Sequence, residues 1–413
     1  MERYEVTPLE APEHVNSEQK LLTLHQGLIN QLKQNGHIST PRVEAAFRAI
    51  PRHLFLPHVA PEEVYQDQAI ATKSLNESIV SSSSQPTIMA IMLEQLQLQP
   101  GQRVLEIGAG TGYNAALMAH IVGELGQVVT LDIDEDIVDG ARAHLATAGF
   151  AQVLVVCADG FDGYPAMAPY DRIILTVHAT DIAPAWYEQL RSDGRLVLPL
   201  SLRGPQVSVA FVPAENYFTA EDNYAVVLLP QESLSLRFAE PRTVNAEEVC
   251  QWLRGPAQDL SLPIQVTYQE LFYCLCFWLS VHEAGTCNLV GLVNTDLEQV
   301  APVLFRHGRK SLLGSTIGLL SEHGLFLLTR DPAQALPAHD GYDPRPFTLW
   351  IRSFGRDSTL ATRLSELVMD WQRAGRPSEQ QLQIRAYPRG IKYTFAKGDI
   401  IVAKRWVHFV FKW

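Results

Sequence analysis

Between residues 86 and 200, short apolar segments alternate with longer segments of helical pattern. The apolar segments are RVLEIG, VVTLDI, VLVVCAD, DRIILTV and RLVLPL. Strands that alternate with helices over about 120 residues predict a parallel, doubly wound sheet. After RLVLPL, the segments QVSVAFVP and YAVVLLP follow each other with only a polar connection between them. We therefore expect an α/β domain over residues 86–235 whose sheet ends in antiparallel strands.

The regions on either side of this domain have different patterns. The segments SEQKLLTLHQGLINQLKQNG and TPRVEAAFRAI carry apolar residues at helical spacing, so residues 1–85 are predicted as an N-terminal helical arm followed by a loop. Beyond about residue 235 the alternation fades. QELFYCLCFWLSV, GLFLLTR, FTLWIRSFG and WVHFVFKW are expected to be strands, and STLATRLSELVMDWQRAG a helix. Residues 240–413 are therefore predicted as a C-terminal α+β domain.

Composition limits the classes of protein that this chain can belong to. A length of 413 residues fits two domains, and a net charge of −12 argues against general binding to nucleic acid, which basic surfaces drive. The five cysteines form no CxxC pair and have no metal-ligand spacing, so we expect a reduced cytoplasmic protein without a metal. The first residues lack the pattern of a signal peptide. The most apolar run, 271–281, is too short to cross a bilayer and is interpreted as a buried strand with Cys274 and Cys276 on one packed face.

The stretch VLEIGAGTGYN, residues 104–114, stands where the first predicted strand turns into a helix. Gly108, Gly110 and Gly112 allow a tight turn and a close approach of a ligand to the backbone at a helix N-terminus. The spacing is GxGxG, whereas dinucleotide sites have GxGxxG. The loop therefore predicts a nucleotide-like ligand that is not a dinucleotide.

Acidic residues stand at the ends of three successive predicted strands. They are Glu106, Asp132 and Asp159. Such acids would repel a pyrophosphate, but they suit a ligand with a ribose, an adenine amino group and a cationic centre. S-adenosylmethionine has all three, and we expect it to be the cofactor. For each acid alone, a solvated loop position or a helix cap is the competing interpretation.

The collinear segments AIPRHLFLP, YQDQAI, SSQPTIMAIMLEQL, VLEIGAGTGY, ADGFDGYPAMAPYDRIILT and LRSDGRLVLPL resemble the protein-L-isoaspartate O-methyltransferase family, over about residues 43–230. TVHATDIAPAW with VSVAF, and the form SSSSQP, are more similar to a branch with an added C-terminal domain. The resemblance implies a Rossmann-like class I methyltransferase sheet. In that branch, enzymes modify ribosomally made peptides, and the aspartyl methyl ester collapses to an aspartimide or isoaspartate.

The resemblance also assigns site residues. The family has a TISQP-like segment whose serine lies at the methyl-transfer site; Ser84 matches that serine and Ser82 the threonine before it. Ser84 is then the catalytic residue, Ser82 and Gly160 join the cofactor site, and Ser83 contacts the substrate. His178, which has no counterpart in the family pattern, is a candidate second donor to the substrate. Two segments depart from the family where the substrate enters, namely ATKSLNESIVSS and the loop that carries His178 and Asp181. A serine cap on a solvated loop is the alternative for SSSSQP, and a surface position is the alternative for His178.

An aspartyl carboxylate is already ionised at neutral pH, so its esterification needs placement and no general base. We expect Ser84 to aim that carboxylate through a hydrogen bond. Residues 381–413 carry seven basic side chains against Asp399, with aromatic residues between them, and Arg389 and Lys392 are candidate contacts to the peptide. A solvated basic face is the alternative there. Competing functions are isoaspartate repair in damaged proteins, an adaptor that keeps its cofactor, and methylation of a small molecule or RNA. We expect no nucleic-acid or membrane partner.

Overall fold

The computed structural model describes residues 13–75, 78–201, 206–226, 235–238, 246–292, 305–306, 313–331, 345–355 and 359–413. The chain divides into two compact units: residues 1–74 and 80–176 form the first, and residues 75–79 and 177–413 form the second. Within the described ranges, no helix is both long enough and apolar enough to cross a membrane.

The first unit begins with the predicted helical arm. Helix α1 spans Glu13–Gln34 and α2 spans Pro41–Ala49, followed by the 3-10 turn η1 at Arg52–Phe55 and the short α3 at Pro61–Val64. The Thr40 hydroxyl accepts the amide of Val43 and caps the start of α2. Glu94 of the following domain accepts both the Ser39 and the Thr40 amides at 2.8 Å. The arm is therefore tied to the domain that follows it.

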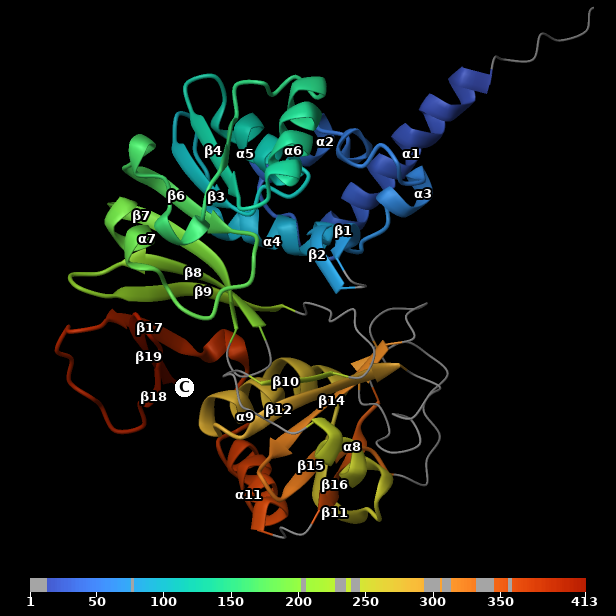
Figure 1. Ribbon diagram of the computed structural model, residues 1–413, viewed down its shortest axis with the longest axis vertical. Coiled ribbons are helices and arrows are strands. Elements are labelled where there is room, and N and C mark those ends of the chain that lie inside the picture. Colours follow the sequence, from blue (N-terminus) through green and yellow to red (C-terminus); the bar gives the residue numbers. More distant parts are fainter. Residues whose placement is uncertain are drawn as a thin grey trace, which may run out of the picture. The chain divides into compact units, whose positions relative to one another are not determined.

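A parallel sheet forms the centre of the first unit (Figure 1). Its strands are β3 (Arg103–Ile107), β4 (Gln127–Asp132), β5 (Leu154–Cys157) and β6 (Tyr170–Leu175), in the order β6-β3-β4-β5. Every neighbouring pair in this set is parallel. The helices are α4 (Pro86–Leu96), α5 (Tyr113–Val122) and α6 (Glu135–Thr147), with 3-10 turns η2 (Gly160–Asp162) and η3 (Pro165–Met167) before β6. The predicted α/β fold is thus confirmed.

A two-stranded ribbon precedes α4. Strand β1 (Ile70–Leu75) pairs with β2 (Ser78–Ser83), and the chain enters α4 directly after β2. The run SSSSQP therefore spans the end of a strand, a short link and the first residue of a helix. This ribbon is the local setting of the predicted catalytic serine.

The second unit contains the predicted antiparallel strands. After α7 (Pro184–Gln189), strands β7 (Leu190–Ser201), β8 (Gln206–Pro213) and β9 (Phe218–Val226) pair in an antiparallel manner. Strand β17 (Gln383–Pro388) pairs with β9 and with β19 (Val407–Lys412), which in turn pairs with β18 (Ile400–Ala403). The order is β18-β19-β17-β9-β8-β7. Of the predicted strand YAVVLLP, residues 227–230 lie outside the described residues.

A separate antiparallel sheet lies in sequence between β9 and β17. Its strands are β10 (Ser235–Phe238), β11 (Gln258–Val266), β12 (Thr286–Leu292), β13 (Phe305–Arg306), β14 (Leu313–Leu320), β15 (Gly324–Thr329) and β16 (Phe347–Gly355). Its helices are α8 (Ala246–Arg254), the π-helical η4 (Glu270–Leu275), α9 (Cys276–His282) and α11 (Thr359–Arg373), and the turn η5 covers Glu379–Gln381. Residues 240–413, expected to form one accessory domain, thus contribute strands to two different sheets.

The prediction of a strand over 271–281 is wrong, because this run is helical in η4 and α9. A continuous apolar run has no alternation, so its pattern cannot separate a buried strand from a buried helix. Trp278 donates its indole N–H to the Leu367 carbonyl of α11 at 3.1 Å, which places the run in the core. Burial raises the pKa of the Cys276 thiol, so that thiol is a packing group.

Candidate active site

The glycine loop joins β3 to α5 by a backbone path that only glycine adopts readily. Gly108, Gly110 and Gly112 all have positive φ, at 103°, 51° and 85°. The Gly108 amide donates to the Leu131 carbonyl at 2.8 Å, which ties the loop to β4. A Cβ on Gly112 would stand 3.1 Å from the Leu145 side chain of α6. The loop is therefore fixed between β4 and α6.

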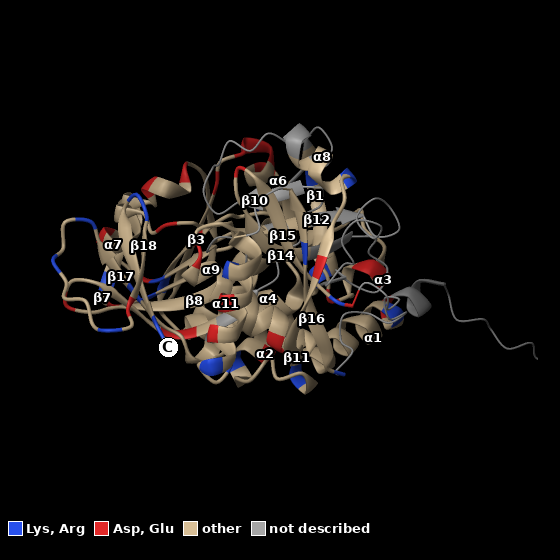
Figure 2. Ribbon diagram, turned by 90° about the horizontal axis from the view of Figure 1, so that it is seen from below, with Lys and Arg blue, Asp and Glu red and all other residues tan. Residues whose placement is uncertain are grey.

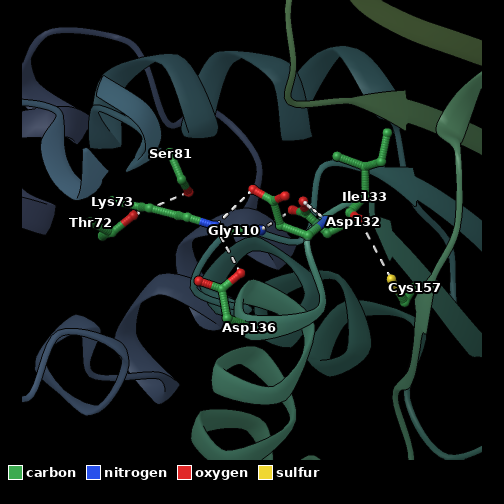
Figure 3. A network of polar contacts seen from close by, with 9 residues as sticks. Thr72, Lys73, Ser81, Gly110, Asp132, Ile133, Asp136 and Cys157 are labelled. Carbon is green, nitrogen blue, oxygen red and sulfur yellow. Dashed lines mark hydrogen bonds and ion pairs between the residues drawn. The ribbon is translucent and has the colours of Figure 1, made fainter. Parts of the chain in front are cut away.

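Two of the predicted acids lie at neighbouring strand ends. The Asp132 carboxylate, at the end of β4, accepts the Gly110 amide at 3.1 Å, so it faces the glycine loop (Figure 3). Asp159 follows β5, is exposed, and accepts the Phe161 amide at 2.9 Å. A Cβ on Gly160 would stand 2.3 Å from Ile107, so only glycine allows this turn to pack on β3. The structure thus brings the glycine loop, Asp132, Asp159 and Gly160 to one edge of the sheet.

Glu106 does not lie on this edge. Its side chain is fully buried, and its carboxylate accepts the Asn114 amide N–H at 2.8 Å and the Thr130 hydroxyl at 2.7 Å. Burial raises the pKa of Glu106 to about 7, against the opposing effect of the two hydrogen bonds. Contrary to the sequence-based expectation, Glu106 therefore holds α5 and β4 in place from inside the protein and does not line the ligand edge.

The four serines have different surroundings. The Ser82 carbonyl lies 3.7 Å from the position of a Cβ on Gly110, so this part of β2 passes beside the glycine loop. The Ser83 side chain is buried, and its hydroxyl accepts a hydrogen bond from Arg52 at 3.2 Å, which argues against the predicted contact with substrate. Ser84 is half-buried, and within the described residues its hydroxyl has no protein partner. Unlike Ser83, Ser84 is therefore available to a substrate, as is Ser82, which is exposed.

The serines do not cap helix α4. The residue before the helix is Gln85, and it makes no side-chain cap. Asp67, from the YQDQAI segment, accepts the Thr87 amide at 2.9 Å and the Thr87 hydroxyl at 2.7 Å, and it also accepts the Gln85 side-chain amide. The serine-cap alternative is thus excluded, because a distant aspartate performs the capping.

Arg52 is a residue that the sequence reasoning missed. Its side chain has no exposed surface, and its guanidinium donates to the Val64 carbonyl of α3 at 2.8 Å and to the Ser84 carbonyl of the SSSSQP segment at 3.0 Å. Burial lowers the pKa of Arg52, while the charge of Asp67 acts in the opposite direction. A signal was present in PRHLFLP, where an arginine stands among apolar residues. Further acceptors of Arg52 are the carbonyls of Gln66, Gln68 and Ser83.

Lys73 connects the ribbon to the cofactor edge (Figure 3). Its Nζ lies 3.0 Å from an Asp134 carboxylate oxygen and 2.8 Å from one of Asp136, at the N-terminus of α6. In the same ribbon, the Thr72 hydroxyl donates to the Ser81 hydroxyl at 3.1 Å. These contacts hold β1 and β2 beside the end of β4. They lie in ATKSLNESIVSS, the first segment that departs from the family pattern.

The second departing segment follows β6 and belongs to the second unit. The His178 ring nitrogen Nδ1 accepts the Gln206 side-chain amide at 2.5 Å, and the imidazole is otherwise exposed. Asp181 accepts the Trp406 backbone amide at 2.8 Å, and burial raises the pKa of its carboxyl. The loop after β6 is therefore bound to the turn between β18 and β19.

The two predicted basic contacts, Arg389 and Lys392, both lie in the loop after β17 and are exposed. The Arg389 guanidinium donates to the Lys404 carbonyl at 3.0 and 2.7 Å. Arg389 therefore has a structural role in addition to its exposed charge.

The chain is similar to known proteins over its first part. The family model for protein-L-isoaspartate (D-aspartate) O-methyltransferase matches residues 23–234. A protein-L-isoaspartate O-methyltransferase of Methanococcoides burtonii is 38% identical over 49% of this chain and 97% of its own length. One of Thermotoga maritima is 38% identical over 45% of this chain, which spans 56% of that relative. A solved structure of a protein-L-isoaspartate O-methyltransferase has a TM-score of 0.47 and 24% identity, covering 87% of this chain and 96% of that one.

The site also fits the cofactor of that family. The nearest atom to a Cβ on Gly110 would be the Ser82 carbonyl oxygen, at 3.7 Å, which leaves room for a ligand beside the loop. The Asp132 carboxylate, which accepts the Gly110 amide, has the hydrogen-bonding capacity that ribose hydroxyls need. The family match extends over this whole edge of the sheet and over the serine loop. The chain therefore belongs to the protein-L-isoaspartate O-methyltransferase family, enzymes that use S-adenosylmethionine.

Proposed function

We propose that this protein esterifies an aspartyl or isoaspartyl carboxylate in a ribosomally made peptide. One observation carries the proposal: the Trp406 amide donates to Asp181 at 2.8 Å. Asp181 lies inside the segment that the family model matches, and Trp406 lies far beyond it. The residues added to the family domain thus support the loop that follows β6, where the resemblance places substrate entry. Such an addition suits an enzyme that selects its peptide.

The roles of the cofactor residues follow from their positions. S-adenosylmethionine, when bound, supplies an electrophilic methyl group. The Gly108, Gly110 and Gly112 backbone forms the surface against which it would lie, with Ser82 beside Gly110. The Asp132 carboxylate would accept ribose hydroxyls and Asp159 the adenine amino group. Glu106 stabilises this surface from inside the protein, because its carboxylate accepts hydrogen bonds from Asn114 of α5 and Thr130 of β4.

The substrate carboxylate is the nucleophile and is ionised at neutral pH, so the protein has to position it. Proximity and orientation can contribute roughly 7–11 kcal/mol to such a reaction. Ser84 donates its hydroxyl hydrogen to one carboxylate oxygen and leaves the other free to react. Arg52 fixes Ser84 for this task by binding its carbonyl. His178 is the second candidate donor to the substrate.

The ester product then reacts without further help from the enzyme. The backbone nitrogen of the residue after the aspartate attacks the ester carbonyl, the new N–C bond closes a five-membered imide, and methanol leaves with the amide proton. Hydrolysis of the imide yields aspartate or isoaspartate.

The test uses the full-length protein and a peptide encoded beside its gene, with methyl transfer followed by mass spectrometry. Ser84→Ala is expected to lower turnover at least tenfold, about 1.4 kcal/mol, and to leave cofactor affinity nearly unchanged. Thr72→Ala is the matched control, since its hydroxyl bonds only within the ribbon. Turnover of Ser84→Ala at the wild-type rate would remove Ser84 from the catalytic role.

Repair of isoaspartate in damaged proteins is the second candidate, because the relatives carry the name protein-L-isoaspartate O-methyltransferase. The same assay separates the two functions. Equal rates on isoaspartyl peptides of unrelated sequence would favour repair. A strong preference for one aspartate in the encoded peptide would favour the biosynthetic function.

A further inference from the structure

The loop between β17 and β18 is held in a defined shape by its own contacts. Besides its guanidinium bonds to Lys404, Arg389 donates its backbone amide to the Trp406 carbonyl at 2.8 Å. At the other end of the loop, Asp399 accepts the Ala396 amide at 2.8 Å. Both ends of this loop are thus clamped, and one clamp is the turn that also binds Asp181.

An aromatic stack supports the middle of the loop. Tyr217 stacks on Tyr387 at 4.7 Å between ring centres, and Tyr387 stacks on Tyr393 at 4.4 Å. The Tyr393 hydroxyl lies 3.2 Å from the His408 Nδ1 atom, which fixes the ring in its plane. The stack ends at Phe395, 4.7 Å from Tyr393, and Phe395 is 56% exposed. A large apolar ring is therefore presented to solvent on a rigid base.

Cations flank this ring in the sequence, with Lys392 before Phe395 and Lys397 after it. We name Arg389, Lys392, Phe395, Lys397 and Arg405 the C-terminal rim. Among the residues that the structure describes, none of its four cations has a carboxylate within ion-pair distance, and blue segments lie in the loops beside β17 and β18 in Figure 2. Asp399 does not neutralise the rim, because its side chain is 2% exposed and faces Arg385 at 3.7 Å.

A solvated basic face is the ordinary explanation for exposed lysines, since isolated surface charges contribute little. Three observations on the rim go beyond that explanation: the chain has a net charge of −12, the four cations have no carboxylate partner in the described part of the chain, and two of them, Lys392 and Lys397, flank an exposed phenylalanine in the sequence. Concentrated positive charge around an aromatic side chain is complementary to acidic peptide segments.

We infer that the C-terminal rim binds an acidic segment of the substrate peptide, separate from the aspartate that is methylated. The inference rests on the proposed function for its substrate. The Lys404–Trp406 turn belongs both to the clamp of the rim and to the support of Asp181. Binding at the rim therefore places the rest of the peptide near the loop that follows β6.

Two labelled peptides test this in the full-length protein. Both contain one isoaspartate; in the first it is followed by a run of glutamates, and in the second by glutamines. The variant Lys392→Gln with Lys397→Gln removes two charges whose side chains make no described bond. It is expected to weaken binding of the glutamate peptide about tenfold and to reduce the salt dependence of that binding. Arg254→Gln, at the end of α8, is the control for loss of exposed charge.

Kinetics give the second measurement. For the glutamate peptide we expect KM to rise in the double variant with kcat unchanged, and for the glutamine peptide we expect neither to change. An equal loss on both peptides, or no loss on either, overturns the inference, as does tighter binding of single-stranded RNA than of the glutamate peptide. Fluorescence anisotropy measures binding without turnover, so failure of the proposed reaction is distinguishable from failure of the rim.

Discussion

The cofactor edge of the first unit and the C-terminal rim of the second use charge in opposite ways. At and behind the cofactor edge, the charged groups are bonded within the protein: Asp132, on the edge, to Gly110; Glu106, buried behind it, to Asn114 and Thr130; and Arg52, buried under the serine segment, to carbonyls. At the rim, four cations lack acidic partners among the described residues. The first arrangement builds a rigid surface, because buried charge is tolerated only when it is satisfied. The second leaves charge available to a molecule outside the chain.

If this contrast is correct, substitutions at the cofactor edge reduce stability or cofactor affinity, whereas rim substitutions affect only peptide binding. The largest effect is expected for Arg52→Met, which removes the buried donor to five carbonyls, of which the Val64 and Ser83 contacts are buried. We expect the free energy of unfolding to fall by about 3–5 kcal/mol. Denaturant titration measures it, with Arg42→Met as control, since Arg42 makes one long bond, at 3.4 Å. Unchanged stability in Arg52→Met would contradict this account of the serine loop.

Glu106→Gln is expected to change how the stability of the protein depends on pH. The pKa of Glu106 is raised to about 7 in the folded protein, from 4.5, so the unfolded chain ionises this group first. Its contribution to stability is therefore full below 4.5 and is lost as the pH rises to about 7. The Gln variant lacks this loss, so its stability relative to wild type should rise by up to about 3 kcal/mol across that window.

Denaturant titration of both proteins below and above this window measures the effect. If the difference in free energy of unfolding between variant and wild type does not change with pH, the Glu106 carboxyl titrates at its ordinary pKa. The glutamine can still accept from Asn114 and bond to Thr130, so the variant is expected to fold.

Asp132→Ala tests the cofactor edge directly. Loss of the acceptor for ribose hydroxyls is expected to weaken S-adenosylmethionine binding at least tenfold, about 1.4 kcal/mol. Isothermal calorimetry provides the affinity. Asp139→Ala is the control, because Asp139 is an exposed residue of α6 whose one partner in the described part of the chain is Arg142. Equal affinities in the two variants would remove Asp132 from the cofactor site.

Lys73→Met is expected to have the smallest effect. Lys73 and its two acidic partners are partly exposed, and such pairs contribute less than about 1 kcal/mol. We expect a small loss of stability that disappears at high salt, and recovery in Lys73→Arg. Thermal melts at two salt concentrations measure this loss. Lys20→Met, which breaks the exposed ion pair between Lys20 and Glu62, is the comparison. A loss above 2 kcal/mol, which is about twice that limit, would mean that the ribbon depends on this contact.

The sequence predicted the regular parts of the fold well, because strand period, glycine spacing and helix patterns are local signals. It also grouped Asp132, Asp159 and the glycine loop at one edge, since parallel strands end on the same side. It could not separate Ser83 from Ser84, because that difference depends on Arg52, 31 residues away along the chain. It misplaced Glu106 for a similar reason: burial of that carboxylate depends on Asn114 and Thr130, which only the folded sheet brings to it.

The pairing of β17 with β9 has a consequence for how the chain folds. Asn223, in β9, donates to the Leu382 carbonyl across 159 residues of sequence. Contacts between such distant segments form late, because a long loop has to close before they stabilise anything. Until then β9 is an edge strand with free N–H and C=O groups, a template for association between chains. Chains cut near residue 235 would keep that edge open and aggregate, whereas the complete sheet ends in β18, a strand of four residues followed by Lys404 and Arg405.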